Sequence, residues 1–193
     1  MFTIVPPFDV LTFSIPKLGF NLDPRGFNAT LLNQDMDKEL WPYKTRDRHA
    51  IVQWNFSYSN AGTMRGMHFQ SAPYEQGKLV YVLEGHIEDG FIDLREDSTI
   101  YRQSSSVSLN STDSNIVGIY IPPGYAHGFF AYMDSMLLYG LTNSYFPDFE
   151  ECIHWSDIKW PKDITYRVQY LSKRDTIAPT LDQYLLAQSV PSL

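Results

Sequence analysis

Short runs of alternating apolar and polar residues follow one another along most of the chain. Successive side chains of a β-strand point to opposite faces, so a period of two is typical of half-buried strands. Turn-forming clusters such as Pro122-Pro123-Gly124 separate the runs. The pattern predicts strands over residues 50–58, 64–70, 78–83, 86–94, 116–121 and 136–142.

Four further segments complete the predicted organisation. Glu84-Gly85, between two apolar runs, predicts a hairpin with a tight glycine turn. Residues 31–40 and 180–188 are weak helix candidates, and the serine-rich residues 104–114 are interpreted as a connecting loop with a short strand inside. Many short strands with regular punctuation indicate an all-β sandwich or barrel, and we expect one domain over residues 1–193.

Composition narrows the class of protein. Of 193 residues, 44% are hydrophobic and 19% charged, which excludes intrinsic disorder. The single cysteine, Cys152, excludes an internal disulfide framework and a four-cysteine zinc site. The aromatic share of 15% is natural for strands, where flat rings pack on a pleated surface.

Charge and hydropathy restrict the partners. The formal net charge of −7 provides no overall positive field for nucleic acid, although a local basic pocket is allowed. No run of eighteen apolar residues predicts a transmembrane helix, and the N-terminus lacks the pattern of a secretory signal. We therefore expect a soluble, cytoplasmic protein with neither a nucleic-acid nor a membrane partner.

The candidate chemistry lies around two histidines. The chain has no P-loop, no dinucleotide glycine fingerprint and no HExxH helix. A metal site in a small barrel usually takes two histidines two residues apart, but Gln70 stands at that distance from His68. This disfavours a metal. On a regular strand Arg65 and His68 face opposite sides, and they could meet one ligand if Gly66 permits a bulge.

Nine sequence blocks, each present once, follow one another in a specific order and spacing. They are Asp23-Pro24-Arg25-Gly26-Phe27, Gln53-Trp54-Asn55-Phe56-Ser57, Met64-Arg65-Gly66-Met67-His68-Phe69-Gln70, Gln76-Gly77-Lys78-Leu79-Val80, Asp93-Leu94-Arg95-Glu96-Asp97-Ser98, Ile121-Pro122-Pro123-Gly124-Tyr125-Ala126-His127-Gly128-Phe129, Tyr145-Phe146-Pro147, Trp160-Pro161 and Leu171-Ser172-Lys173-Arg174-Asp175. Through these blocks the chain resembles the dTDP-4-dehydrorhamnose 3,5-epimerase family of cupin-type sugar-nucleotide epimerases.

The resemblance implies a fold, a ligand and a set of site residues. The fold is a cupin-like double-stranded β-helix (jelly roll) with a few short helices, assembled as a homodimer and working without a metal or another cofactor. The ligand is a nucleotide-diphosphate 4-keto-6-deoxy sugar. The implied catalytic residues are the base His68, its carboxylate partner Asp175, the acid Tyr145 and the cation Lys78. The implied substrate-binding residues are Arg25, Arg65 and His127 for the diphosphate, with Gln53 and Asn55 on the nucleotide side.

The implied reaction inverts C3, C5 or both through an enolate, in deoxysugar and polysaccharide biosynthesis. A proton next to a ketone is too weakly acidic to leave unaided, and a fixed ammonium such as Lys78 can stabilise the enolate oxygen. Histidine titrates near neutral pH and so can accept the proton, while a carboxylate on its other nitrogen fixes the tautomer. Inversion then needs a proton donor on the opposite face of the sugar.

Two departures leave the substrate open. Asn28 and Thr30 stand where the family has an aromatic residue and a glutamate of the nucleotide pocket, so a cytidine or guanosine carrier remains an alternative to thymidine. The family's tyrosine pair is reduced to Tyr145, which could mark inversion of one carbon only. The alternatives in function are a sugar-nucleotide 3,4-ketoisomerase, a non-catalytic cupin that binds a sugar and, more distantly, a metal-dependent cupin oxygenase.

Overall fold

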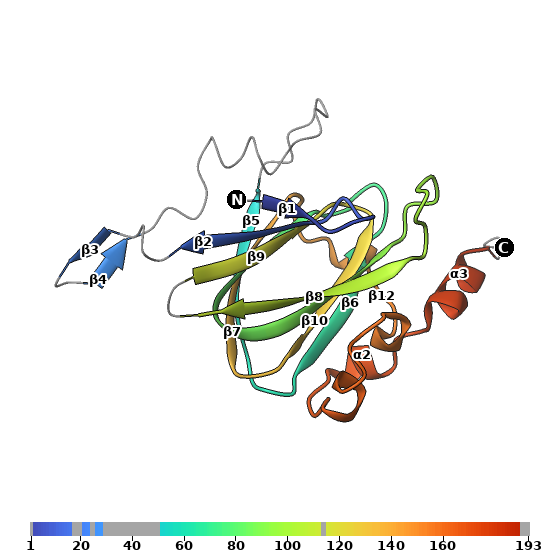
Figure 1. The fold of residues 1–193 in the computed structure, drawn as a ribbon. Coiled ribbons are helices and arrows are strands. Elements are labelled where there is room, and N and C mark those ends of the chain that lie inside the picture. Colours follow the sequence, from blue (N-terminus) through green and yellow to red (C-terminus); the bar gives the residue numbers. More distant parts are fainter. Residues whose placement is uncertain (1, 17–20, 24–25, 29–50, 113–114, 190–193) are drawn as a thin grey trace.

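A computed structural model describes residues 2–16, 21–23, 26–28, 51–112 and 115–189. Most of them lie in antiparallel strands (Figure 1), as the alternating pattern predicts. The strands are β1 (Phe2–Ile4), β2 (Leu11–Pro16), β3 (Asn21–Asp23), β4 (Gly26–Asn28), β5 (Gln53–Ser59), β6 (Met64–Gln70), β7 (Lys78–Asp93), β8 (Ser104–Ser111), β9 (Asn115–Ile121), β10 (Tyr125–Ala131), β11 (Ser135–Leu141) and β12 (Glu150–Cys152). The helices are α2 (Lys173–Thr176) and α3 (Leu181–Ser189), with 3-10 turns at Pro147–Phe149, Trp155–Asp157 and Ile164–Tyr166.

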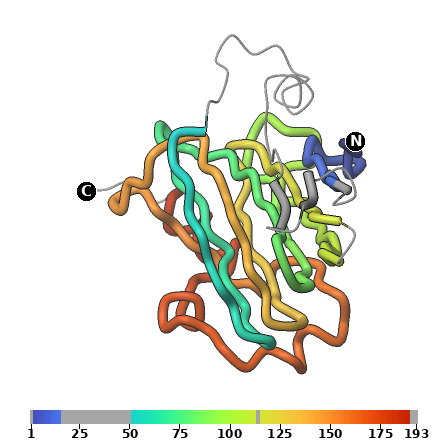
Figure 2. The backbone as a smooth tube through the Cα atoms, turned by 90° about the vertical axis from the view of Figure 1, so that its left-hand side faces the viewer, coloured from blue at the N-terminus to red at the C-terminus, as the bar shows by residue number. Residues whose placement is uncertain are grey.

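Two sheet layers curve around one interior (Figures 1 and 2). One layer follows the order β1-β2-β9-β7-β11-β5, and the other follows β8-β7-β10-β6-β12. In Figure 2 β5 and β11 run side by side along one wall. Inward side chains from both layers form the main core, and its buried members on β7 are Val80, Val82, Ile87 and Phe91. The sequence correctly predicts the all-β architecture.

The prediction of a hairpin at Glu84-Gly85 is wrong. β7 is one continuous strand whose first part pairs with β9 and β11 and whose second part pairs with β8 and β10. Its register against β11 shifts by one residue near Glu84, and Gly85 adopts φ +103°. A bulge with a left-handed glycine has the same local signature as a tight turn, but here it lets the strand pass from one layer to the other.

The segments that flank the barrel differ in part from expectation. Residues 104–111 form the full edge strand β8 rather than a loop with a short strand, because they pair with β7 from Gly85 to Ile92. The C-terminal helix α3 confirms the helix predicted over 180–188. Residues 31–40 lie outside the described part of the chain. None of the described helices is long and apolar enough to cross a membrane.

The C-terminal segment covers the outer face of one layer. Ile153, Ile158 and Leu181 pack against Met67 and Ile92, which point outward from β6 and β7. Figure 1 shows α2 and α3 on the side of β6 and β12. In the sequence α2, which follows Ser172 and contributes to the site, lies between the packed residues Ile158 and Leu181.

Candidate active site

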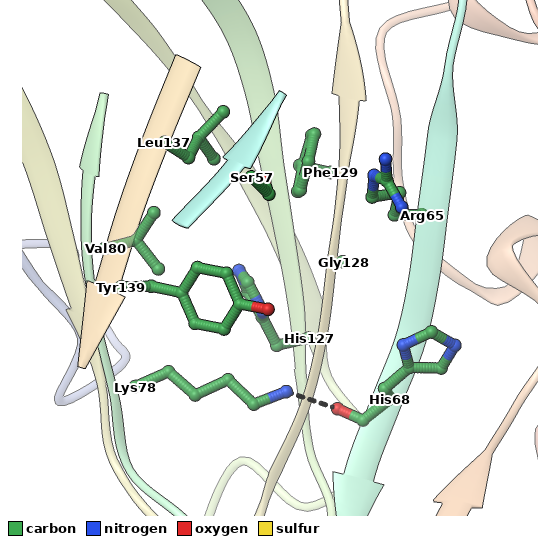
Figure 3. A pocket seen from close by; sticks show the side chains of 10 residues that line it. All are labelled: Ser57, Arg65, His68, Lys78, Val80, His127, Gly128, Phe129, Leu137 and Tyr139. Carbon is green, nitrogen blue, oxygen red and sulfur yellow. Dashed lines mark hydrogen bonds between the residues drawn. The ribbon is translucent and has the colours of Figure 1, made fainter. Parts of the chain in front are cut away.

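A cavity of about 120 Å³ opens between the two layers. Its lining comes from β5, β6, β7, β10 and β11 (Figure 3). The lining residues are Ser57, Arg65, His68, Lys78, Val80, His127, Gly128, Phe129, Leu137 and Tyr139. Four of the residues predicted to act in the site, Arg65, His68, Lys78 and His127, therefore share one cavity.

A bulge in β6 brings Arg65 and His68 to the same side. Opposite β10, His127 pairs with His68 while Phe129 pairs with Arg65, so β6 holds one more residue than β10 between these pairs. Gly66 lies inside the bulge with φ +107°, and a Cβ there would lie 2.7 Å from the backbone of His127 and Gly128. Gly66 thus permits the bulge on which a shared ligand for Arg65 and His68 depends, and no residue with a side chain fits this position.

His68 and Asp175 form a hydrogen-bonded pair. Nε2 of His68 lies 2.6 Å from Oδ1 of Asp175, which leaves Nδ1 of the ring free of this contact. Asp175 is only 2% exposed, and its carboxylate also accepts hydrogen bonds from Ser172 and from the backbone N–H of Gly66. Burial alone would raise the pKa of Asp175, but the hydrogen bond and charge of His68, together with these donors, lower it below its usual range. Asp175 is thus an anion that orients the histidine.

Lys78 places an ammonium beside His68. Its Nζ donates a hydrogen bond to the backbone oxygen of His68 over 3.0 Å (Figure 3). Burial lowers the pKa of Lys78 to about 8, although the negative charges of Glu150 and Asp89 act in the opposite direction. A cation in a poorly hydrated cavity interacts strongly with developing negative charge.

His127 is oriented by a residue that the sequence analysis missed. Its Nε2 lies 2.9 Å from both carboxylate oxygens of Asp89, which is 0% exposed on β7. The alternation of β7 was the available signal, because Asp89 falls on the same face as the core residues Ile87 and Phe91. Each of the two histidines that line the cavity is thus hydrogen-bonded to a buried carboxylate: His68 on β6 to Asp175, and His127 on β10 to Asp89.

Arg65 is fixed along the wall of the cavity. Its Nε donates to Oγ of Ser59 over 2.9 Å, and one terminal nitrogen donates to the backbone oxygen of Tyr58 over 3.2 Å. A guanidinium has five N–H groups, so others remain for a ligand. Arg65 therefore supplies a positive charge to the cavity of an acidic protein.

Tyr145 lies outside the lining of the cavity. It is 48% exposed, and its hydroxyl donates to Oε2 of Glu150 over 2.7 Å. Its backbone N–H donates to Oε1 of Gln53, whose Nε2 donates to Asn55. These three predicted residues are linked to one another, but none of them is among the residues that line the cavity.

Tyr139 lines the cavity instead and was not predicted. It lies on β11 and pairs with Val80 and Asn55, and Figure 3 shows its hydroxyl directed into the cavity on the side of Lys78 and His127. Burial raises the pKa of Tyr139, so its hydroxyl stays protonated at neutral pH. Sequence alternation over residues 136–142 places Tyr139 on the face of Leu137, and this signal was available.

Glu150 and Arg174 also lie near the site. Arg174, next to Asp175, donates hydrogen bonds to the side chain and the backbone oxygen of Glu150. Burial opposes ionisation of Glu150, but the hydrogen bonds from Tyr145 and Arg174 lower its pKa overall. The negative charge of Glu150 favours the protonated form of Lys78, and His68 favours the ionised form of Glu150. The Glu150–Arg174 ion pair therefore belongs to the electrostatics of the site.

Comparison with known proteins decides the family. The family model described as dTDP-4-dehydrorhamnose 3,5-epimerase matches residues 13–183. The chain belongs to this family. It is 36% identical over 191 residues to the dTDP-4-dehydrorhamnose 3,5-epimerase of Salmonella typhimurium, with 96% of this chain and 97% of the relative covered.

Solved structures of other members agree with the fold. An epimerase from Legionella pneumophila, in complex with dTDP-4-keto-L-rhamnose, is 31% identical with a TM-score of 0.79 and covers 100% of this chain and 98% of its own. The epimerase of Mycobacterium tuberculosis is 27% identical with a TM-score of 0.81, with 99% and 93% covered. The predicted jelly roll and the predicted class of enzyme, a sugar-nucleotide epimerase, are confirmed.

Some predicted features fall outside what is described. Arg25 and Thr30 lie outside the described residues, and only the backbone of Asn28 is described, in β4. Within the described part of the chain no group of three or more His, Cys, Asp and Glu side chains is arranged to hold a metal. A reaction without metal or cofactor stays a prediction.

Proposed function

We propose that this epimerase acts on a thymidine-diphosphate-linked 4-keto-6-deoxyhexose and inverts C3, C5 or both, with His68 as the base and Tyr139 as the acid. The observation that carries the proposal is the convergence of three groups on one cavity: the His68–Asp175 pair, the ammonium of Lys78 and the hydroxyl of Tyr139. His68 comes from β6 in one layer and Tyr139 from β11 in the other, which suits proton transfer on the two faces of a sugar ring.

The proposed reaction moves one proton on each face. With Nε2–H bonded to Asp175, Nδ1 of His68 accepts the proton from the carbon next to the ketone. The electron pair of that C–H bond forms the enolate, whose oxygen is stabilised by Lys78. The phenol of Tyr139 then donates its proton to the same carbon from the other side, and the carbonyl re-forms with inverted configuration. Both groups exchange protons with water before the next inversion.

Charge and the relatives support a proposal for how the diphosphate and nucleoside of the substrate are bound. Arg65 binds the diphosphate, together with Arg25, which stays a prediction because it lies outside the described residues. Thymidine is favoured over cytidine or guanosine because the Legionella relative is described in complex with a dTDP sugar.

Activity is expected to decline at alkaline pH. Lys78 has a pKa of about 8, so its ammonium is charged below this pH and neutral above it. The neutral amine stabilises an enolate poorly, and kcat/KM should therefore fall as the pH rises through about 8. Measurement of kcat/KM from pH 6 to pH 10 tests for this alkaline fall.

The variant Lys78→Gln tests whether loss of the Lys78 charge causes the alkaline fall in kcat/KM. It should lose about 10²-fold or more in kcat/KM at pH 7 and show no fall near pH 8, whereas Lys159→Gln, outside the cavity, should keep the wild-type profile. A basic limb that persists in Lys78→Gln would contradict the assignment of the limb to Lys78.

A homodimer is proposed through the outer face of β5. Val52, Trp54, Phe56 and Tyr58 are 56%, 44%, 60% and 52% exposed and share the outward face of this segment. Among the described strands β5 pairs only with β11, so no described strand covers its other edge. Four exposed apolar side chains in a row are typical of an interface.

Phe56→Lys tests the dimer. It should shift the mass measured by light scattering from two chains to one, because a charge cannot be buried unpaired at an apolar interface. Tyr166→Lys, at a residue that is 90% exposed on the C-terminal segment, should leave the mass unchanged. A wild-type protein that is monomeric at micromolar concentration would refute the proposed dimer.

The reaction and its carrier are tested by product analysis. Freshly generated dTDP- and CDP-4-keto-6-deoxyglucose are each mixed with the enzyme and followed by carbon and proton NMR. A product with its carbonyl still at C4 and inverted C3, C5 or both supports the proposal, and the faster substrate identifies the carrier. A carbonyl at C3 indicates a 3,4-ketoisomerase, and binding without any product indicates a non-catalytic cupin. A cytoplasmic location and a single domain stay predictions.

A further inference from the structure

The inward face of β5 carries a row of polar side chains. Alternate residues of a strand share a face, so Gln53, Asn55, Ser57 and Ser59 point to the same side. Gln53 donates to Asn55 over 3.1 Å, and Ser59 accepts from Arg65 over 2.9 Å. The hydroxyl of Ser57 is buried and has no hydrogen-bond partner among the described residues. Ser57 is thus the unsatisfied member of this row.

The surroundings of Ser57 offer it no partner within the wall of the cavity. Its neighbours in the lining include Leu137, to which it is directly paired across β5 and β11, and Phe129 (Figure 3). These two side chains neither donate nor accept hydrogen bonds. Because buried hydroxyls in proteins are nearly always bonded, the missing partner is expected in what fills the cavity.

We propose that Ser57 is a positioning and specificity residue whose hydroxyl bonds the C2 hydroxyl of the substrate's sugar ring. The inference rests on the proposed function, in which Lys78 holds the C4 oxygen and Arg65 the diphosphate on C1. C2 and C3 lie between those two anchors along one side of the ring. Where C3 is inverted, its hydroxyl changes orientation, whereas the C2 hydroxyl keeps its place in every case.

The chemistry around Ser57 favours a neutral partner. An anionic phosphate oxygen needs cationic or multiple donors. The cation on this wall, Arg65, bonds Ser59 rather than Ser57, and the side chains of Leu137 and Phe129 beside Ser57 are apolar. A sugar hydroxyl both donates and accepts, as a serine hydroxyl does, so one such pair satisfies both groups. A substrate without the C2 hydroxyl leaves Ser57 unpaired and should be disfavoured.

The first test separates positioning from stability. Ser57→Ala should lower kcat/KM by about 10-fold, since one hydrogen bond between neutral groups is lost in the complex. Its melting temperature should stay equal or rise, because the deleted hydroxyl has no partner in the free protein. Ser57→Thr keeps the hydroxyl and should recover most of the activity. Ser111→Ala, whose hydroxyl donates to backbone oxygens on β7 and β9, serves as the control with unchanged kcat/KM.

The second test uses a substrate that lacks the C2 hydroxyl. Wild type should process dTDP-4-keto-2,6-dideoxyglucose about 10-fold less efficiently than the 2-hydroxy substrate, and Ser57→Ala should process the two at similar efficiency. An equal loss for Ser57→Ala on both substrates would overturn the inference. Weaker binding of dTDP alone by Ser57→Ala would also overturn it and assign the hydroxyl to the diphosphate. If wild type transforms neither substrate, the proposed function itself fails.

Discussion

Replacing His68 by asparagine is expected to lower kcat at least about 10³-fold and to stop the entry of solvent deuterium into the sugar. Asparagine can still hydrogen-bond Asp175, so the wall of the cavity is kept, but it cannot accept a proton at neutral pH. Stopped-flow and NMR measurements on the same preparation give the turnover and the exchange. Unchanged exchange in this variant would remove His68 from the reaction.

Two further variants sharpen this result. In Asp175→Asn, kcat should fall about 10²-fold or more, because the neutral amide no longer stabilises the imidazolium or fixes the tautomer of His68. His86→Asn is the matched control, since His86 bonds Ser108 on the edge strand β8 and is not part of the cavity lining. Its kcat should equal that of wild type within about two-fold.

Replacing Tyr139 by phenylalanine is expected to separate exchange from inversion. His68 can still remove the proton and return a solvent deuteron to the same face, so label enters the sugar while its configuration is retained. Without the phenol hydroxyl the opposite face has no donor, and the rate of inversion should fall about 10²- to 10³-fold. NMR of the recovered substrate measures the label, and the product signal measures inversion.

Tyr145→Phe is the companion variant. Its hydroxyl bonds Glu150 at an exposed position outside the cavity lining, so the variant should change KM more than kcat. If Tyr145→Phe instead abolished inversion while Tyr139→Phe inverted normally, the acid would be Tyr145, as the resemblance alone implies. The two variants differ from wild type by one oxygen each, which makes the comparison direct.

The sequence predicts features that depend on local pattern. Alternation identifies the strands that line the cavity, and the glycine between Arg65 and His68 indicates where a bulge can turn both side chains to one side. The same kind of reasoning fails at Gly85, since a left-handed glycine fits both a hairpin turn and a bulge in a continuous strand. Only the pairing partners of β7, which are distant in sequence, distinguish the two.

Features that depend on distant contacts needed the structure or the resemblance. Asp175 lies 107 residues from His68 and stands in a run of charges that would ordinarily be solvated. Tyr139 and Tyr145 are two of 13 tyrosines, and both lie in or near the same predicted strand. Their different positions follow from β11 pairing with β7 and from the end of that strand at Leu141, after which Tyr145 leaves the cavity wall.

The most direct test is proton NMR of the wild-type enzyme with dTDP-4-keto-6-deoxyglucose in deuterium oxide, beside the His68→Asn variant. A base on one face and an acid on the other predict that deuterium enters every carbon that is inverted, at C3, C5 or both. The His68→Asn variant should then show neither label nor inversion. A product with inverted carbons that still carry their original hydrogen would contradict proton transfer through the enolate, and with it the central mechanism.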